Sequence, residues 1–289
     1  MKCNLCPREC GADRENGDKG FCRVGADAIV CRAAPHLWEE PCICGKNGSG
    51  TVFFAGCNLG CVFCQNSKIS RGDAGRKYSA SSLADVYIDL QNKGVSNINF
   101  VTPSPWVNVI KESLDIAWGK GLYLPTVYNC GGYEKVETIR SLSGYIGVYM
   151  PDFKYMDREL SKKYSFAPDY PDVAKRALYE MVNQRGDAIY NSEGIMTKGV
   201  IVRHLILPSH TEDSMRVLEY LHREYGSSIV ISIMSQYTPM PNMLPPLDRR
   251  VTDEEYRTVV AYAEALGITN AFIQDGESAL ESFIPDFSV

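Results

Sequence analysis

The sequence predicts an α/β fold, a partial TIM-like barrel of roughly six β/α units with a small Cys-rich metal-binding cap at its N-terminus. From residue 48 onward, short apolar runs alternate with helical stretches, as in consecutive β/α units. The residues before this point are rich in Cys, Gly, Pro and charge and show little periodicity. The length of 289 residues suits one barrel with an appendage, because such barrels reach about 250 residues as one unit. We therefore divide the chain into a cap, residues 1–47, and a barrel with a C-terminal helix and strand, residues 48–289.

The composition excludes several classes of protein. With 45% hydrophobic and 22% charged residues, the chain is typical of a folded globular protein rather than a disordered or fibrous one. A formal net charge of −5 disfavours general affinity for nucleic acid. No apolar run of about 18 residues occurs and the N-terminus has no secretory h-region, so we expect a cytoplasmic protein outside the membrane. Clustered cysteines in that reducing compartment indicate metal ligands rather than disulfides.

Seven β-rich apolar runs are the predicted strands. A capping box formed by Thr252 and Glu255 begins the predicted C-terminal helix, and Gly267 ends it. A second helix is predicted over residues 173–184. The strands cover residues 51–55, 98–101, 124–128, 146–150, 200–207, 229–234 and 271–273.

Functional groups in a parallel α/β barrel gather at the edge where the strands end. Polar, thiol or Gly-rich residues follow six of the predicted strands, so we expect them to share one rim. These residues are Gly56-Cys57, Thr102-Pro103-Ser104, Asn129-Cys130-Gly131-Gly132, Asp152-Phe153-Lys154, Pro208-Ser209-His210 and Ser235-Gln236-Tyr237.

A C-x₃-C-x₂-C triplet, Cys57, Cys61 and Cys64, directly follows the first barrel strand. Three thiolates on one short loop can hold three irons of a [4Fe–4S] cube and leave the fourth iron open to another ligand. A structural zinc site ordinarily has four protein ligands, and a catalytic one has three and a water. A zinc knuckle or redox-inert buried thiols are the alternatives to the cluster.

This triplet, with the aromatic Phe63 before its third cysteine and a barrel after it, resembles the radical S-adenosylmethionine (SAM) superfamily. The resemblance implies that Cys57, Cys61 and Cys64 bind a [4Fe–4S] cluster whose open iron chelates SAM. An electron passed through the cluster would cleave the sulfonium C–S bond to methionine and a 5′-deoxyadenosyl radical. That radical would abstract hydrogen from a substrate, and the protein would position the donor.

Other rim residues resemble the branch of pyruvate formate-lyase activating enzyme-like proteins, the activases of glycyl radical enzymes. Asp152-Phe153-Lys154 is similar to their Asp-Leu/Ile-Lys motif, although a rim ion pair is the alternative for these two charges. Thr102-Pro103-Ser104 stands where many members have Gly-Gly-Glu, and an Arg common just before the cluster strand is absent. The resemblance implies SAM-binding roles for Thr102, Ser104, Asn129, Asp152, Lys154, Arg203 and Gln236.

A second cysteine set lies at the N-terminus. Cys3, Cys6, Cys10 and Cys22 supply four thiolates, enough to close a tetrahedral site. Without metal, this Gly-rich and charged segment has too little apolar material to order itself. Zinc or a rubredoxin-like iron, an auxiliary Fe–S cluster and no metal all remain open. The remaining cysteines are Cys31, Cys42, Cys44 and the rim residue Cys130, and we expect them mainly as small core residues. The alternatives are substitute metal ligands for the first three, and a hydrogen donor or radical relay for Cys130.

These observations lead to three hypotheses. In the first, the chain is a radical SAM oxidoreductase that abstracts hydrogen from a partner protein, at a glycine of a glycyl radical enzyme. In the second, the same chemistry acts on a small molecule or a peptide. In the third, the chain is a non-catalytic metal-binding scaffold. The resemblance implies an electron donor of the flavodoxin or ferredoxin type.

Overall fold

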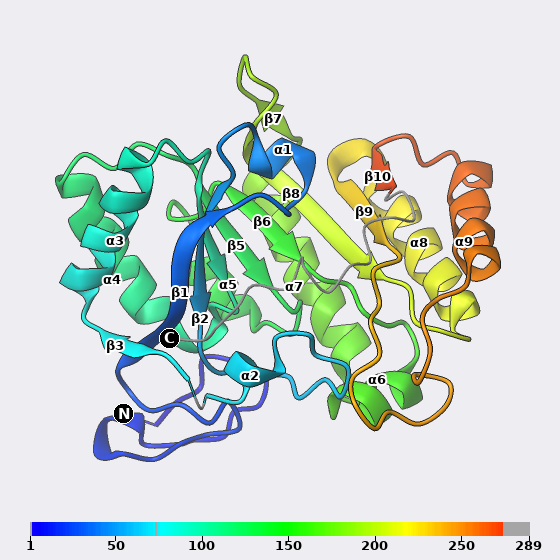
Figure 1. Ribbon diagram of the computed structural model, residues 1–289, viewed down its shortest axis with the longest axis horizontal. Helices are drawn as coiled ribbons and strands as arrows, with labels where there is room; N and C mark the ends of the chain where they lie inside the picture. The colour runs from blue at the N-terminus through cyan, green and yellow to red at the C-terminus, as the bar shows by residue number, and fades with distance from the viewer. Residues whose placement is uncertain (1, 73, 274–289) are drawn as a thin grey trace.

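A computed structural model describes residues 2–72 and 74–273 and confirms the predicted α/β partial barrel (Figure 1). Its centre is a ten-stranded open sheet with the order β10-β9-β8-β6-β5-β4-β2-β1-β3, and β7 pairs with β8. All neighbouring pairs from β2 to β10 along this order are parallel, and β1 and β3 add an antiparallel edge. The strands are β1 (Ala28–His36), β2 (Ser49–Phe54), β3 (Arg76–Tyr78), β4 (Ile98–Val101), β5 (Thr126–Cys130), β6 (Val148–Pro151), β7 (Ile189–Tyr190), β8 (Met196–Leu205), β9 (Val230–Met234) and β10 (Ala271–Ile273).

The inner strands are buried on both faces, because helices cover the outside and side chains fill the inside. Every residue of β2, β4, β5, β6 and β9 is buried, as expected for continuous apolar strands of a parallel sheet. None of the helices in the described ranges is long and apolar enough to cross a membrane. The α-helices are α1 (Pro41–Cys44), α2 (Ser67–Ser70), α3 (Ala80–Asn92), α4 (Val107–Gly119), α5 (Val136–Ser141), α6 (Arg158–Ser165), α7 (Tyr170–Arg185), α8 (Thr211–Tyr225) and α9 (Asp253–Ala265).

The two ends of the barrel are closed differently. The short helix α1, which precedes β2, lies at the end of the sheet where the parallel strands begin, and α2, which follows β2, lies at the opposite end (Figure 1). Cys42 and Ile43 of α1 pack among apolar side chains of β5, β6, β8 and β9. Both Cys42 and Cys44 are buried, as small core residues are. The candidate functional end, where the predicted rim residues follow the strands, is therefore the end where the parallel strands finish.

Strand β1 was not predicted from the sequence, and it lies inside the region assigned to the cap. It pairs with β2 from Val30 opposite Phe54 to His36 opposite Ser49. Arg32 and Pro35 interrupt the apolar alternation that signals a strand, and both are exposed, as a strand near the sheet edge permits. The domain boundary at residue 47 stays a prediction, but residues 28–36 belong to the sheet.

The capping box predicted at Thr252 is present at the start of α9, and it extends into a wider network. Glu255 accepts hydrogen bonds from the backbone N–H of Thr252 (2.8 Å) and of Ser209 (2.7 Å), and from the guanidinium of Arg249 (2.7 Å). The hydrogen bonds from Arg249 and from the two backbone N–H groups together lower the pKa of Glu255 to about 2, although burial opposes them. This network joins α9 to the loop that follows β8.

A carboxylate whose pKa is lower in the folded than in the unfolded chain stabilises the fold at pH values above its unfolded pKa. This stabilisation is lost as the pH falls through the folded pKa. We expect Glu255→Gln to lower the free energy of unfolding by about 1 kcal/mol at pH 7, since the carboxylate is partly solvated. The difference from the wild type should shrink as pH falls from the ordinary 4.5 toward 2. Urea unfolding at several pH values measures this, with the exposed neighbour Glu254→Gln as control. A difference that stays constant down to pH 2 would contradict the assignment.

Candidate functional site

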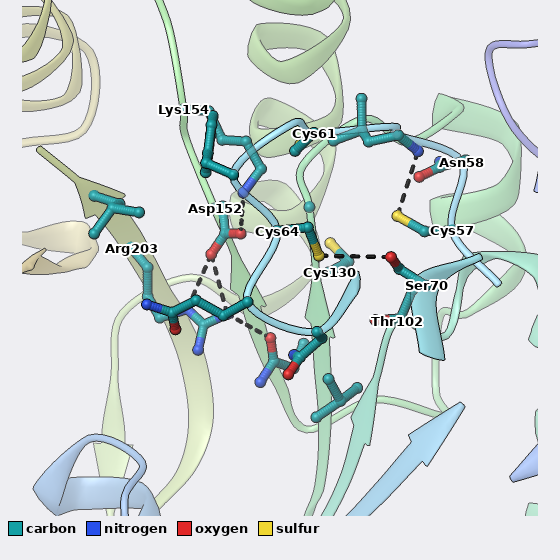
Figure 2. A pocket seen from close by; sticks show the side chains of 18 of the residues that line it. Cys57, Asn58, Cys61, Cys64, Ser70, Thr102, Cys130, Asp152, Lys154 and Arg203 are labelled. Carbon is teal, nitrogen blue, oxygen red and sulfur yellow. Dashed lines mark hydrogen bonds and ion pairs between the residues drawn. The ribbon is translucent and has the colours of Figure 1, made fainter. Parts of the chain in front are cut away.

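A cavity of about 240 Å³ lies at the end of the barrel where the parallel strands finish. Its lining comes from the loop after β2 and from the ends of β4, β5, β6, β8 and β9 (Figure 2). The structure thus brings together every rim residue for which a cofactor or cluster role was predicted. These are Cys57, Cys61, Cys64, Thr102, Ser104, Asn129, Asp152, Lys154, Arg203 and Gln236.

The turn that carries Cys57 out of β2 requires a glycine. Gly56 has a φ of +80°, in the left-handed region that favours glycine. A Cβ at this position would lie 2.7 Å from a Val24 methyl carbon and 2.8 Å from the Cys22 carbonyl oxygen. Trp106 donates from its indole Nε1 to the carbonyl oxygen of Ala55 at 2.9 Å and fixes the strand end beside this turn. The loop that follows, Cys57–Cys64, is called the cluster loop below.

Each thiol of the cluster loop has a hydrogen-bond partner. The backbone N–H of Leu59 donates to Cys57 Sγ at 3.3 Å, and Cys61 Sγ lies 2.9 Å from Ser165 Oγ. Cys64 Sγ donates to Ser70 Oγ at 3.6 Å, as Figure 2 shows. These contacts set the direction of all three side chains before any ligand binds.

Burial raises the pKa of Cys57 and Cys61, and the neighbouring thiols raise that of Cys57 further. Lys154 opposes this effect at Cys61. A bound metal would supply the positive charge that three adjoining thiolates need. Within residues 2–72 and 74–273, no group of three or more His, Cys, Asp or Glu side chains has the spacing for a single ion.

One wall of the cavity is an alternating row of charges, with Asp152 between Lys154 and Arg203 (Figure 2). Lys154 Nζ donates to Asp152 Oδ2 at 2.6 Å, and Arg203 Nε donates to Asp152 Oδ1 at 3.0 Å. Arg203 Nη2 also donates to Asn129 Oδ1 at 2.7 Å. The sheet order explains this row, because β5, β6 and β8 are adjacent and each contributes one of these groups at or near its end.

The charges in this row hold each other ionised. Burial alone would raise the pKa of Asp152, but Lys154 and Arg203 hold it below its usual value. Burial would lower the pKa of Lys154 and of Arg203, but Asp152 raises both. The ion pair considered as an alternative at the rim is thus present. It does not exclude contact with a ligand, because Lys154 has further N–H donors.

Sequence reasoning missed Glu39, which lies beneath this row. It precedes α1 and reaches up from the other end of the barrel, so that its Oε2 lies 3.5 Å from Arg203 Nη1. Its Oε1 accepts from the side-chain amides of Asn99 (3.1 Å) and Asn129 (3.5 Å). Burial raises the pKa of Glu39 to about 7, although Arg203 opposes this. The only sequence signal was a pair of acidic residues next to a buried helix, Glu39 and Glu40.

The wall formed after β4 is strained and polar. Thr102 has a φ of +59°, which is unusual for a β-branched residue, and its N–H donates to the Asn129 carbonyl oxygen at 3.0 Å. Ser104 Oγ donates to the buried carboxyl of Glu134, which also accepts from Tyr128 at 3.2 Å. Burial raises the pKa of Glu134 to about 7. Strained backbone of this kind concentrates at functional sites.

The last wall is tied to the cluster loop. Gln65 Nε2, just beyond the third cysteine, donates to the Gln236 carbonyl oxygen at 2.9 Å. Phe63 packs edge-on against the buried Tyr237 with ring centroids 6.2 Å apart. Cys130 also lines the cavity and is buried, whereas His210 pairs with Tyr164 outside the lining. The SAM-binding role predicted for Gln236 stays a prediction, and the buried position expected for Cys130 is confirmed.

The N-terminal cysteines lie at a second place. Cys3, Cys6, Cys10 and Cys22 line a smaller cavity of about 20 Å³, which shares Asn58 and Ser104 with the larger one. Cys31, Cys42 and Cys44 do not line it.

Comparison with known proteins adds two sequence matches. Residues 44–118, which include the cluster loop, match the family described as a 4Fe-4S single cluster domain. An uncharacterized protein of Methanocaldococcus jannaschii is 29% identical over 274 residues, a match that covers 91% of this chain and 74% of that protein.

Several solved structures have a similar fold. A radical SAM methyltransferase from Sphaerobacter thermophilus superposes with a TM-score of 0.54 at 13% identity, over 78% of this chain and 66% of that one. HydG, a maturase of the [FeFe]-hydrogenase, gives 0.53 at 17% identity, over 81% and 54%. Streptococcus suis SuiB bound to S-adenosylmethionine gives 0.52 at 13% identity, over 77% and 49%. The chain spans about half to two thirds of the length of these structures and shares the partial barrel of radical SAM proteins.

The buried charge row gives a testable prediction. Asp152→Asn removes the anion that holds Lys154 and Arg203, so two buried cations lose their common partner. We expect the free energy of unfolding to fall by about 3 kcal/mol, since breaking a buried pair from one side is strongly destabilising. Denaturant unfolding measures this, and Asp89→Asn on the exposed side of α3 is the matched control. Equal stability of Asp152→Asn and the wild type would show that the row does not stabilise the fold.

Proposed function

We propose that this protein is a radical SAM enzyme, in which Cys57, Cys61 and Cys64 hold three irons of a [4Fe–4S] cluster and the cavity beside them binds SAM. One observation carries the proposal: three thiols on one short loop face a cavity at the functional end of a radical SAM-type barrel. The match of residues 44–118 to a 4Fe-4S single cluster domain supports it.

The residues present suit this cofactor. Three thiolates leave one iron of a cube without a protein ligand from the loop, which is the arrangement that admits a chelating substrate. Bound by Cys57, Cys61 and Cys64, the cluster would supply the one electron that cleaves the SAM sulfonium C–S bond to methionine and a 5′-deoxyadenosyl radical, the species for hydrogen abstraction. The chain's own tasks are to bind SAM, to orient it and to exclude water.

The charge row would orient the methionine part of SAM. Arg203 already donates to Asp152 and Asn129 and lies against Glu39, so most of its donors are engaged within the chain. Lys154 has one bond to Asp152, and a lysine ammonium carries three N–H groups. Lys154 is therefore the cation with donors left for the SAM carboxylate, and Arg203 is a positioning residue that holds Asp152 and Asn129.

Apolar side chains complete the cavity and would keep water and oxidants away from a reactive intermediate. Leu59, Phe63, Val101, Leu205 and Met234 line it alongside the polar groups. Exclusion of water strengthens the electrostatic contacts inside a site and prevents side reactions.

The proposal extends to the substrate, for which there are two candidates. The similarity of Asp152-Phe153-Lys154 to the activase motif supports hydrogen abstraction from a glycine of a partner enzyme, with an electron donor of the flavodoxin or ferredoxin type. The Thr102-Pro103-Ser104 segment departs from that pattern, so a small molecule or a peptide is the second candidate.

Removal of the middle thiol tests the cluster. After anaerobic reconstitution, we expect Cys61→Ser to lose the iron and sulfide of one [4Fe–4S] cluster and to release 5′-deoxyadenosine at below about 1% of the wild-type rate with dithionite and SAM. Cys31→Ser, a buried thiol outside both cavities, is the control and should keep iron and activity. Wild-type protein that carries its cluster and releases no 5′-deoxyadenosine would instead support a non-catalytic scaffold.

Lys154 provides a test of SAM binding that is separate from the cluster. Loss of a charge-assisted hydrogen bond costs about 1.5–3 kcal/mol, so Lys154→Met should weaken SAM binding about 10- to 100-fold. The iron content should remain that of the wild type, because Lys154 is not a ligand. Lys120→Met, which removes a surface ion pair with Asp85, is the control. Unchanged SAM affinity in Lys154→Met would remove Lys154 from the binding site.

The partner hypothesis is tested by electron paramagnetic resonance. The reduced protein, SAM and a candidate glycyl radical enzyme are mixed anaerobically, and a glycyl doublet on the partner is the expected result. Release of 5′-deoxyadenosine without a doublet across such partners would contradict protein activation and favour the small-molecule or peptide substrate.

A further inference from the structure

We propose that Cys3, Cys6, Cys10 and Cys22 bind a second metal centre through four thiolates, and that this centre fixes residues 2–25 on the cluster loop. The centre takes a thiophilic cation, either Zn²⁺ or the iron of an Fe–S cluster. This inference does not depend on the proposed radical chemistry.

The backbone gathers the four thiols at one place. The N–H of Cys3 donates to the Ala12 carbonyl oxygen at 2.9 Å, and the N–H of Gly11 donates to the Cys3 carbonyl oxygen at 3.1 Å. This pairing places Cys3 next to Cys10, and all four thiols line the same small cavity. A Cβ at Gly20 would lie 2.5 Å from Cys10 Sγ, so a glycine is needed for the sulfur to lie there.

Charge also favours a metal-thiolate centre at this position. Four thiolates around Zn²⁺ or around a [4Fe–4S]²⁺ core carry a net charge of about −2. The side chains of Arg8 and Arg14 line the same cavity, and their two positive charges would offset it.

The segment has little apolar core of its own. Val24 is the only fully buried residue described among residues 2–25, and the only helix described there is a single 3₁₀ turn, Arg14–Asn16. A metal bound by the four thiolates would contribute folding free energy to such a segment.

Arg8 links the segment to the cluster loop by hydrogen bonds. Arg8 Nε donates to the Asn58 carbonyl oxygen at 2.9 Å, and Arg8 Nη1 and Nη2 donate to the carbonyl oxygens of Phe166 (2.6 Å) and Ser165 (3.3 Å). Ser165 is in turn the partner of Cys61. A metal that fixes residues 2–25 would therefore also fix Arg8, and Arg8 would hold the cluster loop from outside.

The four sulfurs do not converge on one point as they stand, since no group in residues 2–72 and 74–273 is spaced for a single ion. Binding of either centre would therefore require some side-chain rearrangement, and a polynuclear Fe–S cluster holds its ligands further apart than a single ion does. Zn²⁺ and an Fe–S cluster would be bound by the same four thiolates, and metal analysis distinguishes them.

Metal analysis tests the centre directly. The variant Cys57→Ser/Cys61→Ser/Cys64→Ser removes the first cluster only, so we expect it to retain either about one zinc or a set of iron and sulfide per chain. Cys6→Ser should lose that metal alone and keep the first cluster, and Cys31→Ser should keep both. Absence of any bound metal in the triple variant, with folded protein shown by circular dichroism, would overturn the proposal. A failure of the radical chemistry leaves this result unaffected, because the triple variant has no catalytic cluster.

Hydrogen exchange tests the link between the two sites. Removal of the second metal from the triple variant by a chelator should speed exchange of the amides of residues 2–25 and of residues 57–64 at least several-fold. Arg8→Ala should keep the metal and speed exchange in the cluster loop alone. Unchanged exchange in both segments after the metal is removed would contradict the role assigned to the centre, and this test does not require a cysteine variant of the N-terminal set to fold.

Discussion

The cluster loop is the constraint on which the functional end of this protein depends. The three thiols must point into one cavity, but the loop that carries them is too short to fix its own conformation. The direction of the loop is therefore set by contacts with the rest of the chain. Gly56 allows the turn out of β2, Ser165 and Ser70 orient two of the thiols, and Gln65 ties the loop to the segment after β9. The barrel acts as the rigid support that makes these contacts repeatable.

The charge row beside the loop follows from the order of the strands. Asn129, Asp152 and Arg203 belong to neighbouring strands of a parallel sheet, so their side chains meet although they lie far apart in sequence. Buried charges of this kind persist only when each has a partner. Glu39 completes the set from below, and Lys154 is left as the cation with donors for a ligand.

Much of this arrangement was predictable from the sequence, because the strands are continuous apolar runs and the residues after them are polar or glycine. That rule placed Cys57, Asp152 and Lys154 at one rim. It could not find β1, because Arg32 and Pro35 interrupt the alternation of apolar residues that identifies a strand. It also could not find Glu39, because this residue reaches the site from the opposite end of the barrel. Both depend on contacts between distant segments, to which local periodicity is insensitive.

The most direct measurement of the central claim is the electron paramagnetic resonance spectrum of the dithionite-reduced protein, recorded with and without SAM. If three thiolates hold a cube whose fourth iron is open to SAM, the spectrum of the reduced cluster changes when SAM is added, and ⁵⁷Fe labelling shows one iron distinct from the other three. A reduced cluster whose spectrum is the same with and without saturating SAM would contradict the account.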